Sequence, residues 1–230
     1  GEPLKSKVLF DLFRIERFSA LLNDKGKLDY TLRSEQEEAV QKAIDYFQKT
    51  EKGEFLWNAK PRFGKTLASY DLAKRLGANK VLIVTNRPAI ANSWFDDFEM
   101  FVDGYAFISE TSSLKNRATL TREQHIAIRP IKPLITFLSL QDLKGSIYFG
   151  GNYDKLRWVA DLEWDLLIID EAHEGVDTGR TDAAFDVIKR KYTLHLSGTP
   201  FKALANEKFP KEAIYNWTYL DEQKIKQLEL

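Results

Sequence analysis

The chain has 230 residues, of which 43% are hydrophobic, so it can bury one sizeable α/β core. Its 34 basic and 34 acidic residues cancel, and the overall charge therefore gives no reason to expect a nucleic-acid partner. The chain has no cysteine, which excludes disulfides and thiolate metal sites, and no apolar run approaches membrane-spanning length. We expect a cytoplasmic protein that does not contact a membrane.

Residues 1–30 contain too many apolar side chains for a disordered tail, so we expect a helical leader followed by a domain from residue 31 to residue 230. A helix is predicted next, because Ser34 and Glu37 have the spacing of a capping box. Gln36 then lies in the first helical turn. The apolar residues that share one face of this helix are Val40, Ala43, Ile44 and Phe47.

A phosphate-binding loop is predicted at residues 59–66, between an apolar run at residues 55–58 and a helix that Gly77 ends. At a helix N-terminus, unpaired N–H groups and the helix dipole favour a phosphate. Lys65 would neutralise the β- and γ-phosphates of a nucleotide, and the Thr66 hydroxyl would bind Mg²⁺. The residues predicted to bind ATP in this loop are Ala59, Lys60, Pro61, Arg62, Phe63, Gly64, Lys65 and Thr66. The alternative is a surface turn that contains a lysine.

Two later apolar runs, at residues 81–84 and 134–138, are strand-like and end in polar residues. Hydroxyl and amide groups at strand ends suit contact with nucleic-acid phosphates better than reading of bases. The predicted contacts are Thr85, Asn86, Arg87, Ser139 and Gln141. The alternative is an ordinary polar loop after each strand.

A pair of carboxylates follows the aliphatic run at residues 166–169, which is typical of a strand buried on both faces of a parallel sheet. At the carboxyl edge of such a sheet, Asp170 can hold Mg²⁺, usually through water. Glu171 is then placed to orient and deprotonate an attacking water. The alternative is that the pair only begins a solvated loop.

Seven apolar runs, near residues 55, 81, 105, 134, 166, 192 and 214, alternate with helical or irregular segments. This order predicts a mainly parallel sheet covered by helices on both faces. Residues 144–158 contain a glycine turn and indicate a projecting hairpin to which we assign no role.

Besides the phosphate-binding loop, the chain contains Asp170-Glu171-Ala172-His173 and Ser197-Gly198-Thr199-Pro200. By these three motifs, residues 31 to about 220 resemble the first RecA-like motor domain of superfamily-two helicases and translocases with a DEAH box. In that family the first loop position is commonly alanine, as it is here. The resemblance implies a RecA-like P-loop fold, with Asp170, Glu171 and Lys65 as catalytic residues and Asp170 with Thr66 at the metal.

The same resemblance assigns roles to residues outside the loop. Gln36, in the segment that begins at Leu32 and Arg33, would recognise adenine, and Arg33 would be a further ATP-binding residue. His173 would contact Ser197 or Thr199 across the cleft and couple the nucleotide state to the grip on nucleic acid.

Within the superfamily, Ser-Gly-Thr-Pro-Phe at residues 197–201, with Trp217 beyond it, looks most like the motor subunits of type I and type III restriction enzymes. That implies Mg-ATP hydrolysis coupled to movement on double-stranded DNA, and nuclease or specificity subunits as further partners. A second RecA-like domain of the parent protein would supply an arginine to the transferred phosphoryl group, so this chain alone is expected to be a weak ATPase. The alternatives are a DNA or RNA unwinding helicase and, in another class, a non-hydrolysing nucleotide-binding interaction module.

Overall fold

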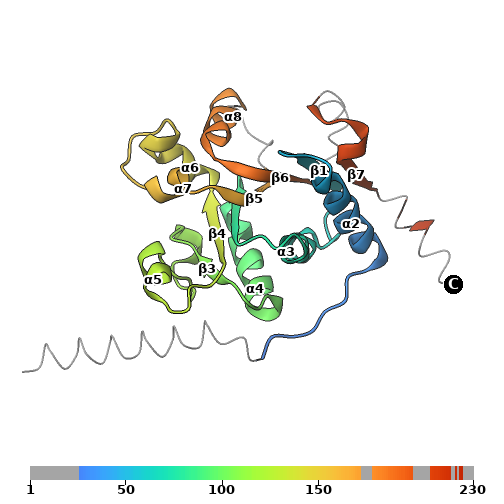
Figure 1. Cartoon of the computed structure of the whole chain (residues 1–230), viewed down its shortest axis with the longest axis horizontal. Helices are drawn as coiled ribbons and strands as arrows, with labels where there is room; N and C mark the ends of the chain where they lie inside the picture. Colours follow the sequence, from blue (N-terminus) through green and yellow to red (C-terminus); the bar gives the residue numbers. More distant parts are fainter. Residues whose placement is uncertain (1–25, 172–177, 199–207, 219–220, 222, 225–230) are drawn as a thin grey trace, which may run out of the picture.

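The computed structural model describes residues 26–171, 178–198, 208–218, 221 and 223–224. They build one seven-stranded, all-parallel sheet in the order β3-β4-β2-β5-β6-β1-β7 (Figure 1). Its strands are β1 (Glu54–Ala59), β2 (Lys80–Thr85), β3 (Ala106–Ile108), β4 (Leu134–Ser139), β5 (Trp164–Asp170), β6 (Arg190–Ser197) and β7 (Ile214–Trp217). Each of the seven predicted apolar runs is a strand. Most of the predicted leader, residues 1–25, lies outside the described residues.

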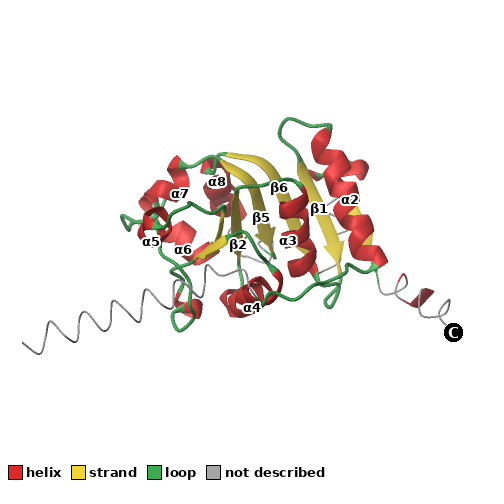
Figure 2. Cartoon of the chain, turned by 60° about the horizontal axis from the view of Figure 1, so that its bottom comes forward, coloured by secondary structure: helices red, strands yellow, loops and turns green. Residues whose placement is uncertain are grey.

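Helices cover both faces of the sheet, as Figure 2 shows. The helices are α2 (Ser34–Gln48), α3 (Lys65–Arg75), α4 (Ala91–Phe101), α5 (Arg122–Ala127), α6 (Leu140–Gly145), α7 (Arg157–Asp161) and α8 (Thr178–Val187). Helices α2, α3 and α4 pack on one face, and α6, α7 and α8 pack on the other. No helix in the described part of the chain is long and apolar enough to cross a membrane.

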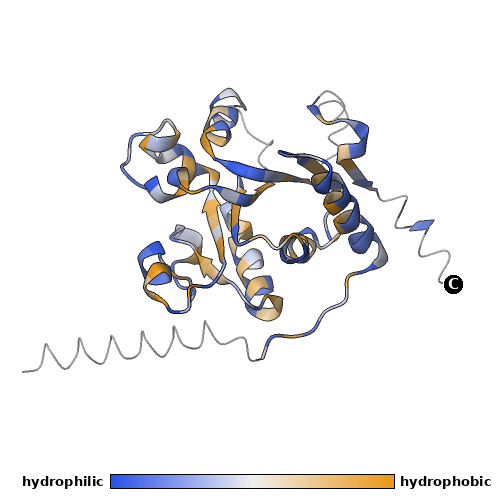
Figure 3. Ribbon diagram, in the orientation of Figure 1, coloured by the Kyte–Doolittle hydropathy of each residue, from blue (hydrophilic) through white to orange (hydrophobic). Residues whose placement is uncertain are grey.

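Strand β5 shows why helices must pack on both faces of the sheet. Its side chains point alternately to opposite faces, with Leu166 and Ile168 in one buried cluster and Leu167 and Ile169 in the other. Burying each such side chain contributes about 1.5–3 kcal/mol relative to leaving it exposed. Figure 3 shows hydrophobic residues gathered along the central strands and the inward sides of the helices.

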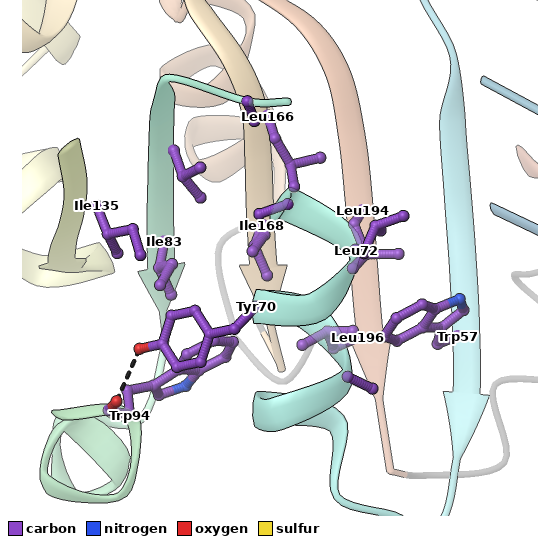
Figure 4. Close-up of a cluster of buried hydrophobic side chains, with 14 of the residues drawn as sticks. Trp57, Tyr70, Leu72, Ile83, Trp94, Ile135, Leu166, Ile168, Leu194 and Leu196 are labelled. Carbon is purple, nitrogen blue, oxygen red and sulfur yellow. Dashed lines mark hydrogen bonds between the residues drawn. The ribbon is translucent and has the colours of Figure 1, made fainter. Parts of the chain in front are cut away.

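On the face covered by α3 and α4, large aromatic side chains fill the space between helices and sheet (Figure 4). The ring of Tyr70 meets the ring of Trp94 edge-on, with centroids 5.3 Å apart. The Tyr70 hydroxyl also donates to the backbone oxygen of Trp94 at 2.7 Å. The helix that follows the phosphate-binding loop is thus joined directly to α4.

Two local predictions are wrong. The capping box of α2 is formed one residue earlier, because Arg33 has an extended backbone and its N–H donates to Gln36 Oε1 at 2.9 Å. Residues 144–158 are not a hairpin: no antiparallel ladder forms, and the backbone N–H groups of Asn152 and Tyr153 both donate to the oxygen of Gly145. They make a compact loop with a 3-10 turn at Ile147–Phe149, next to α7.

Candidate active site

The predicted catalytic motifs meet at the carboxyl edge of the sheet, because β5, β6 and β1 are neighbours there. Gly198, just after β6, marks the meeting point. A Cβ atom placed on Gly198 would lie 2.9 Å from Glu171 Oε1, 3.5 Å from Lys65 Nζ and 3.8 Å from Pro61 Cδ. The structure therefore brings together one residue from each of the three sequence motifs.

The phosphate-binding loop is shaped by two left-handed residues, Arg62 with φ 71° and Gly64 with φ 80°, directly before α3. Lys65 opens the helix, and its ammonium group donates to the backbone oxygen of Ala59 at 2.6 Å. Burial lowers the pKa of Lys65, while the nearby carboxylates of Glu171 and Asp170 act in the opposite direction. Thr66 follows in the first turn of α3, partly exposed.

Gln36 and Arg33 hold the loop from the side of α2. The Gln36 amide donates to the oxygen of Phe63 at 2.9 Å, and its own oxygen accepts from the Arg33 N–H. The Arg33 guanidinium donates to the same Phe63 oxygen at 2.6 Å and to that of Arg62 at 3.2 Å. In this structure the Gln36 amide therefore contacts the loop rather than open space. Adenine recognition by Gln36 stays a prediction.

Glu171 is held in place by both its backbone and its carboxylate. Its φ of 52° is left-handed, which is uncommon for a residue with a side chain. Its N–H donates to the oxygen of Leu196 at 3.1 Å, and its Oε1 accepts from the N–H of Gly198 at 2.6 Å. The end of β6 therefore orients the predicted general base.

Asp170 is almost fully buried at the end of β5, with 6% of its surface exposed. Its Oδ2 accepts a hydrogen bond from the indole N–H of Trp94 at 3.0 Å. Burial raises the pKa of Asp170 to about 6, even though the Trp94 hydrogen bond and the charges of Lys65 and Arg87 oppose the rise. When it is ionised, this carboxylate supplies the oxygen ligands that magnesium prefers.

Two of the predicted nucleic-acid contacts, Thr85 and Ser139, are buried in this structure, and their role as contacts stays a prediction. Thr85 is fully buried, and its hydroxyl accepts from the Arg87 N–H at 3.0 Å, so it shapes the turn after β2. Ser139 is 4% exposed, and its hydroxyl caps α6 by accepting from the Asp142 N–H at 3.0 Å. Both hydroxyls lie at strand ends, as predicted, but each one accepts a hydrogen bond from a backbone N–H group just beyond the strand.

The other predicted contacts, Asn86, Arg87 and Gln141, have exposed surface. They directly follow strands that end at the same edge as Asp170, because Thr85 is paired in register with both Ser139 and Asp170. Their role as contacts stays a prediction. All three lie at the edge of the sheet that carries Asp170, which is compatible with that role.

The predicted coupling residues are described only in part. His173 and Thr199 lie outside the described residues, as does residue 172 of the DEAH box. Ser197 is 2% exposed at the end of β6. Among the described residues, no group of three or more His, Cys, Asp or Glu is arranged to hold a metal ion by itself.

The contact of Trp94 with Asp170 was not predicted from the sequence. The apolar periodicity of Ile90, Trp94, Phe98 and Phe101 puts Trp94 on the inward face of α4, where it is 1% exposed. Periodicity says nothing about where an indole N–H points. A buried tryptophan usually satisfies its N–H, and that rule was the available signal that it had some polar partner.

A parallel α/β sheet with these motifs at its carboxyl edge is the fold of a superfamily-two helicase motor domain, and comparison with known proteins agrees. Residues 29–202 match the family described as the type III restriction enzyme, res subunit. The match covers well over half of the chain, and the chain belongs to this family. It is also 30% identical over 257 aligned positions to a Mycoplasma pneumoniae protein named as the C-terminus of a type II restriction enzyme and methyltransferase. The alignment covers 94% of this chain and 35% of that protein, so the chain spans about a third of its relative.

Solved structures show the same fold at low identity. The SWI2/SNF2 ATPase core of Sulfolobus solfataricus in complex with double-stranded DNA aligns with a TM-score of 0.58 and 16% identity, over 82% of this chain and 36% of that one. The UvsW helicase of bacteriophage T4 aligns with a TM-score of 0.55 and 16% identity, over 89% and 66%.

Proposed function

We propose that this chain is the ATP-binding motor domain of a DNA-dependent ATPase of the restriction-enzyme type, which couples Mg-ATP hydrolysis to movement on double-stranded DNA. The observation that supports this most strongly is the meeting of Lys65, Glu171 and Gly198 at one edge of the sheet. A cation, a carboxylate and a backbone donor from three strand ends are the groups that positioning of a phosphoryl transfer needs.

Each residue has a role in this proposal. Lys65 would exchange its bond to the Ala59 oxygen for the outer phosphates of ATP. Thr66 and Asp170 would hold Mg²⁺, which would neutralise charge on those phosphates. Glu171, oriented by Gly198, would accept a proton from the attacking water.

The proposed contacts with DNA are polar residues that lie next to the candidate active site. Asn86, Arg87 and Gln141 would contact backbone phosphates at the edge that carries Asp170. The restriction-enzyme names of the family and relative, and the duplex in the Sulfolobus complex, favour double-stranded DNA. A second RecA-like domain in the parent protein would supply an arginine worth roughly 10³–10⁵ in rate, so the isolated chain should turn ATP over slowly.

The test is ATP turnover by the complete protein that contains this chain, with no nucleic acid, duplex DNA, single-stranded DNA or RNA. Duplex DNA should stimulate turnover, and Lys65→Ala should abolish it. Glu171→Gln should still bind ATP but turn it over about 10²–10⁴-fold more slowly, because it lacks the general base.

Other outcomes would change the assignment. Stimulation by single strands or RNA alone would favour an unwinding helicase. ATP binding without turnover under every condition, unchanged by Glu171→Gln, would overturn the motor and favour a nucleotide-binding interaction module.

A further inference from the structure

The indole of Trp94 contacts the carboxylate predicted to hold the metal. Its N–H donates to Asp170 Oδ2 at 3.0 Å, and the two side chains are 1% and 6% exposed. A hydrogen bond to a charged group in such a buried place is stronger than one between neutral groups in water. We therefore expect the hydrogen bond to affect the Asp170 carboxylate as well as to satisfy the indole N–H.

This hydrogen bond determines which way the Asp170 carboxylate faces. The terminal torsion of an aspartate has broad, roughly two-fold energy wells, so packing alone orients it weakly. With Oδ2 directed at Trp94, the orientation of Oδ1 is defined as well. Partners that orient a metal-binding carboxylate in this way commonly tune how tightly the metal binds.

Trp94 is itself held by α3, the helix that starts at Lys65. Tyr70 of α3 donates from its hydroxyl to the Trp94 backbone oxygen at 2.7 Å, and the two rings meet at an interplanar angle of 88° (Figure 4). Tyr70 is also buried, at 1% exposed. The indole therefore has little freedom to leave Asp170.

Trp94 also lies close in sequence to the proposed DNA edge. Helix α4 begins at Ala91, directly after the turn at Pro88–Ile90 that follows Asn86 and Arg87. Trp94 therefore connects the segment that follows β2 to the carboxylate at the end of β5.

We propose that Trp94 is a positioning residue that holds Asp170 in the orientation needed for Mg²⁺ and ties α4 to the metal site. This rests on the proposed function, since it requires a Mg-nucleotide at Asp170. Trp94 is also part of the core, so loss of stability in a variant would not separate the two roles.

Trp57 provides a matched control. It lies in the same buried cluster, is 0% exposed, and its indole N–H has no hydrogen-bond partner among the described residues. Trp57→Phe and Trp94→Phe remove the same volume and keep an aromatic ring. Only Trp94→Phe removes a hydrogen bond to Asp170.

The experiment measures binding of a fluorescent ATP analogue to the complete protein as Mg²⁺ is titrated, so that it does not depend on turnover. Trp94→Phe should raise the Mg²⁺ concentration for half-maximal binding by roughly 10- to 100-fold. Trp57→Phe should leave it within about two-fold of wild type. Equal Mg²⁺ requirements in the two variants would overturn the proposal.

A second measurement uses the wild-type protein, so it does not depend on whether a variant folds. With ¹⁵N-labelled tryptophan and a non-hydrolysable ATP analogue present, the Trp94 indole N–H signal should move as Mg²⁺ is added, and that of Trp57 should not. A Trp94 signal that ignores Mg²⁺ would contradict the proposal.

Asp170→Asn separates failure of this inference from failure of the proposed function. If wild type shows no Mg²⁺-dependent nucleotide binding, or Asp170→Asn does not weaken it, the proposed metal site itself is wrong. If both behave as expected and Trp94→Phe matches Trp57→Phe, only the role of Trp94 is wrong.

Discussion

Glu171 occupies a strained backbone conformation, with φ 52°. Such a conformation costs roughly 1–3 kcal/mol for a residue other than glycine, and it persists only where the surroundings enforce it. Here the oxygen of Leu196 and the N–H of Gly198 hold the residue from β6. We interpret the strain as the means by which the carboxylate is turned toward Lys65 instead of toward solvent.

Gly198→Ala should therefore disturb catalysis without unfolding the protein. The new methyl group would meet Glu171 Oε1 at 2.9 Å, so the end of the Glu171 side chain would have to move out of its held position. ATP turnover by the complete protein should fall on the order of 10²-fold, because a small misplacement of a catalytic group is enough for such a loss. The free energy of unfolding should change by less than about 1 kcal/mol.

Gly179→Ala is the control for this substitution. Gly179 is in α8, and a Cβ atom there would meet nothing within 4 Å. It should leave turnover unchanged. Equal turnover in the two variants would show that the contact between Gly198 and Glu171 does not matter for the reaction.

At the scale of elements, α2 and the phosphate-binding loop are linked mainly through polar side chains at the start of the helix. Gln36 is 6% exposed and bridges the Arg33 N–H and the Phe63 oxygen. An interior polar group that loses its partner is destabilising, so the helix and the loop depend on each other. The loop is preorganised by α2 as well as by its own glycine.

Gln36→Ala should consequently lower the free energy of unfolding by about 1 kcal/mol, the usual contribution of such hydrogen bonds. It should also weaken ATP and GTP binding by a similar factor, because the loop loses its support. Urea unfolding and nucleotide titration would measure the two effects. Gln41→Ala, which removes an exposed glutamine from the same helix, should change neither.

A different pattern would favour the sequence prediction of adenine recognition. If Gln36→Ala weakened ATP binding far more than GTP binding and left unfolding unchanged, the amide would contact the base. The structure shows the amide on the loop, and a bound nucleotide would then have to draw it away.

Across the whole molecule, buried ionisable groups make stability depend on pH. Burial lowers the pKa of His195 from its usual 6.5, although the Glu54 carboxylate at 2.8 Å opposes this. The hydrogen bond from His195 lowers the pKa of Glu54 from 4.5 to about 2, although burial opposes this. Both groups bind protons more tightly in the unfolded chain than in the folded one.

Acid should therefore destabilise the fold in two stages. Stability should fall below about pH 6.5, because His195 is protonated more readily in the unfolded chain, and fall again between about pH 4.5 and 2 because of Glu54. Asp170 acts against the first stage, because burial raises its pKa to about 6 and it takes up a proton more readily in the folded chain. Thermal unfolding midpoints from pH 8 to pH 3 would measure the trend. His125, whose pKa burial also lowers, adds to the first stage.

His195→Gln keeps a side-chain N–H near Glu54 but does not titrate. Its unfolding midpoint should fall less steeply between pH 7 and pH 5 than that of wild type. An identical slope in the two proteins would exclude His195 as a source of the first stage.

Much of the fold was predictable from particular sequence patterns. The apolar runs were strands because each is short, apolar and followed by polar or turn residues, and the helix after Lys65 was bounded by Gly77, whose φ is 64°. Local contacts of polar side chains were less predictable. The capping box forms at Arg33 instead of Ser34, and the Thr85 and Ser139 hydroxyls accept hydrogen bonds from nearby backbone N–H groups. Several groups compete for one hydroxyl or amide, and only the final turn geometry selects the partner.

The sequence by itself determined which residue types lie at the ends of the strands: a lysine and threonine after β1, two carboxylates at the end of β5 and a glycine after β6. Spacing and periodicity are patterns over a few residues, so they are sufficient to place these residue types at the strand ends. Only the tertiary structure decided that β5, β6 and β1 lie side by side and that Gly198 touches Glu171. It also decided that the Trp94 indole reaches Asp170, because that contact joins residues 76 positions apart and depends on how α4 packs against the sheet.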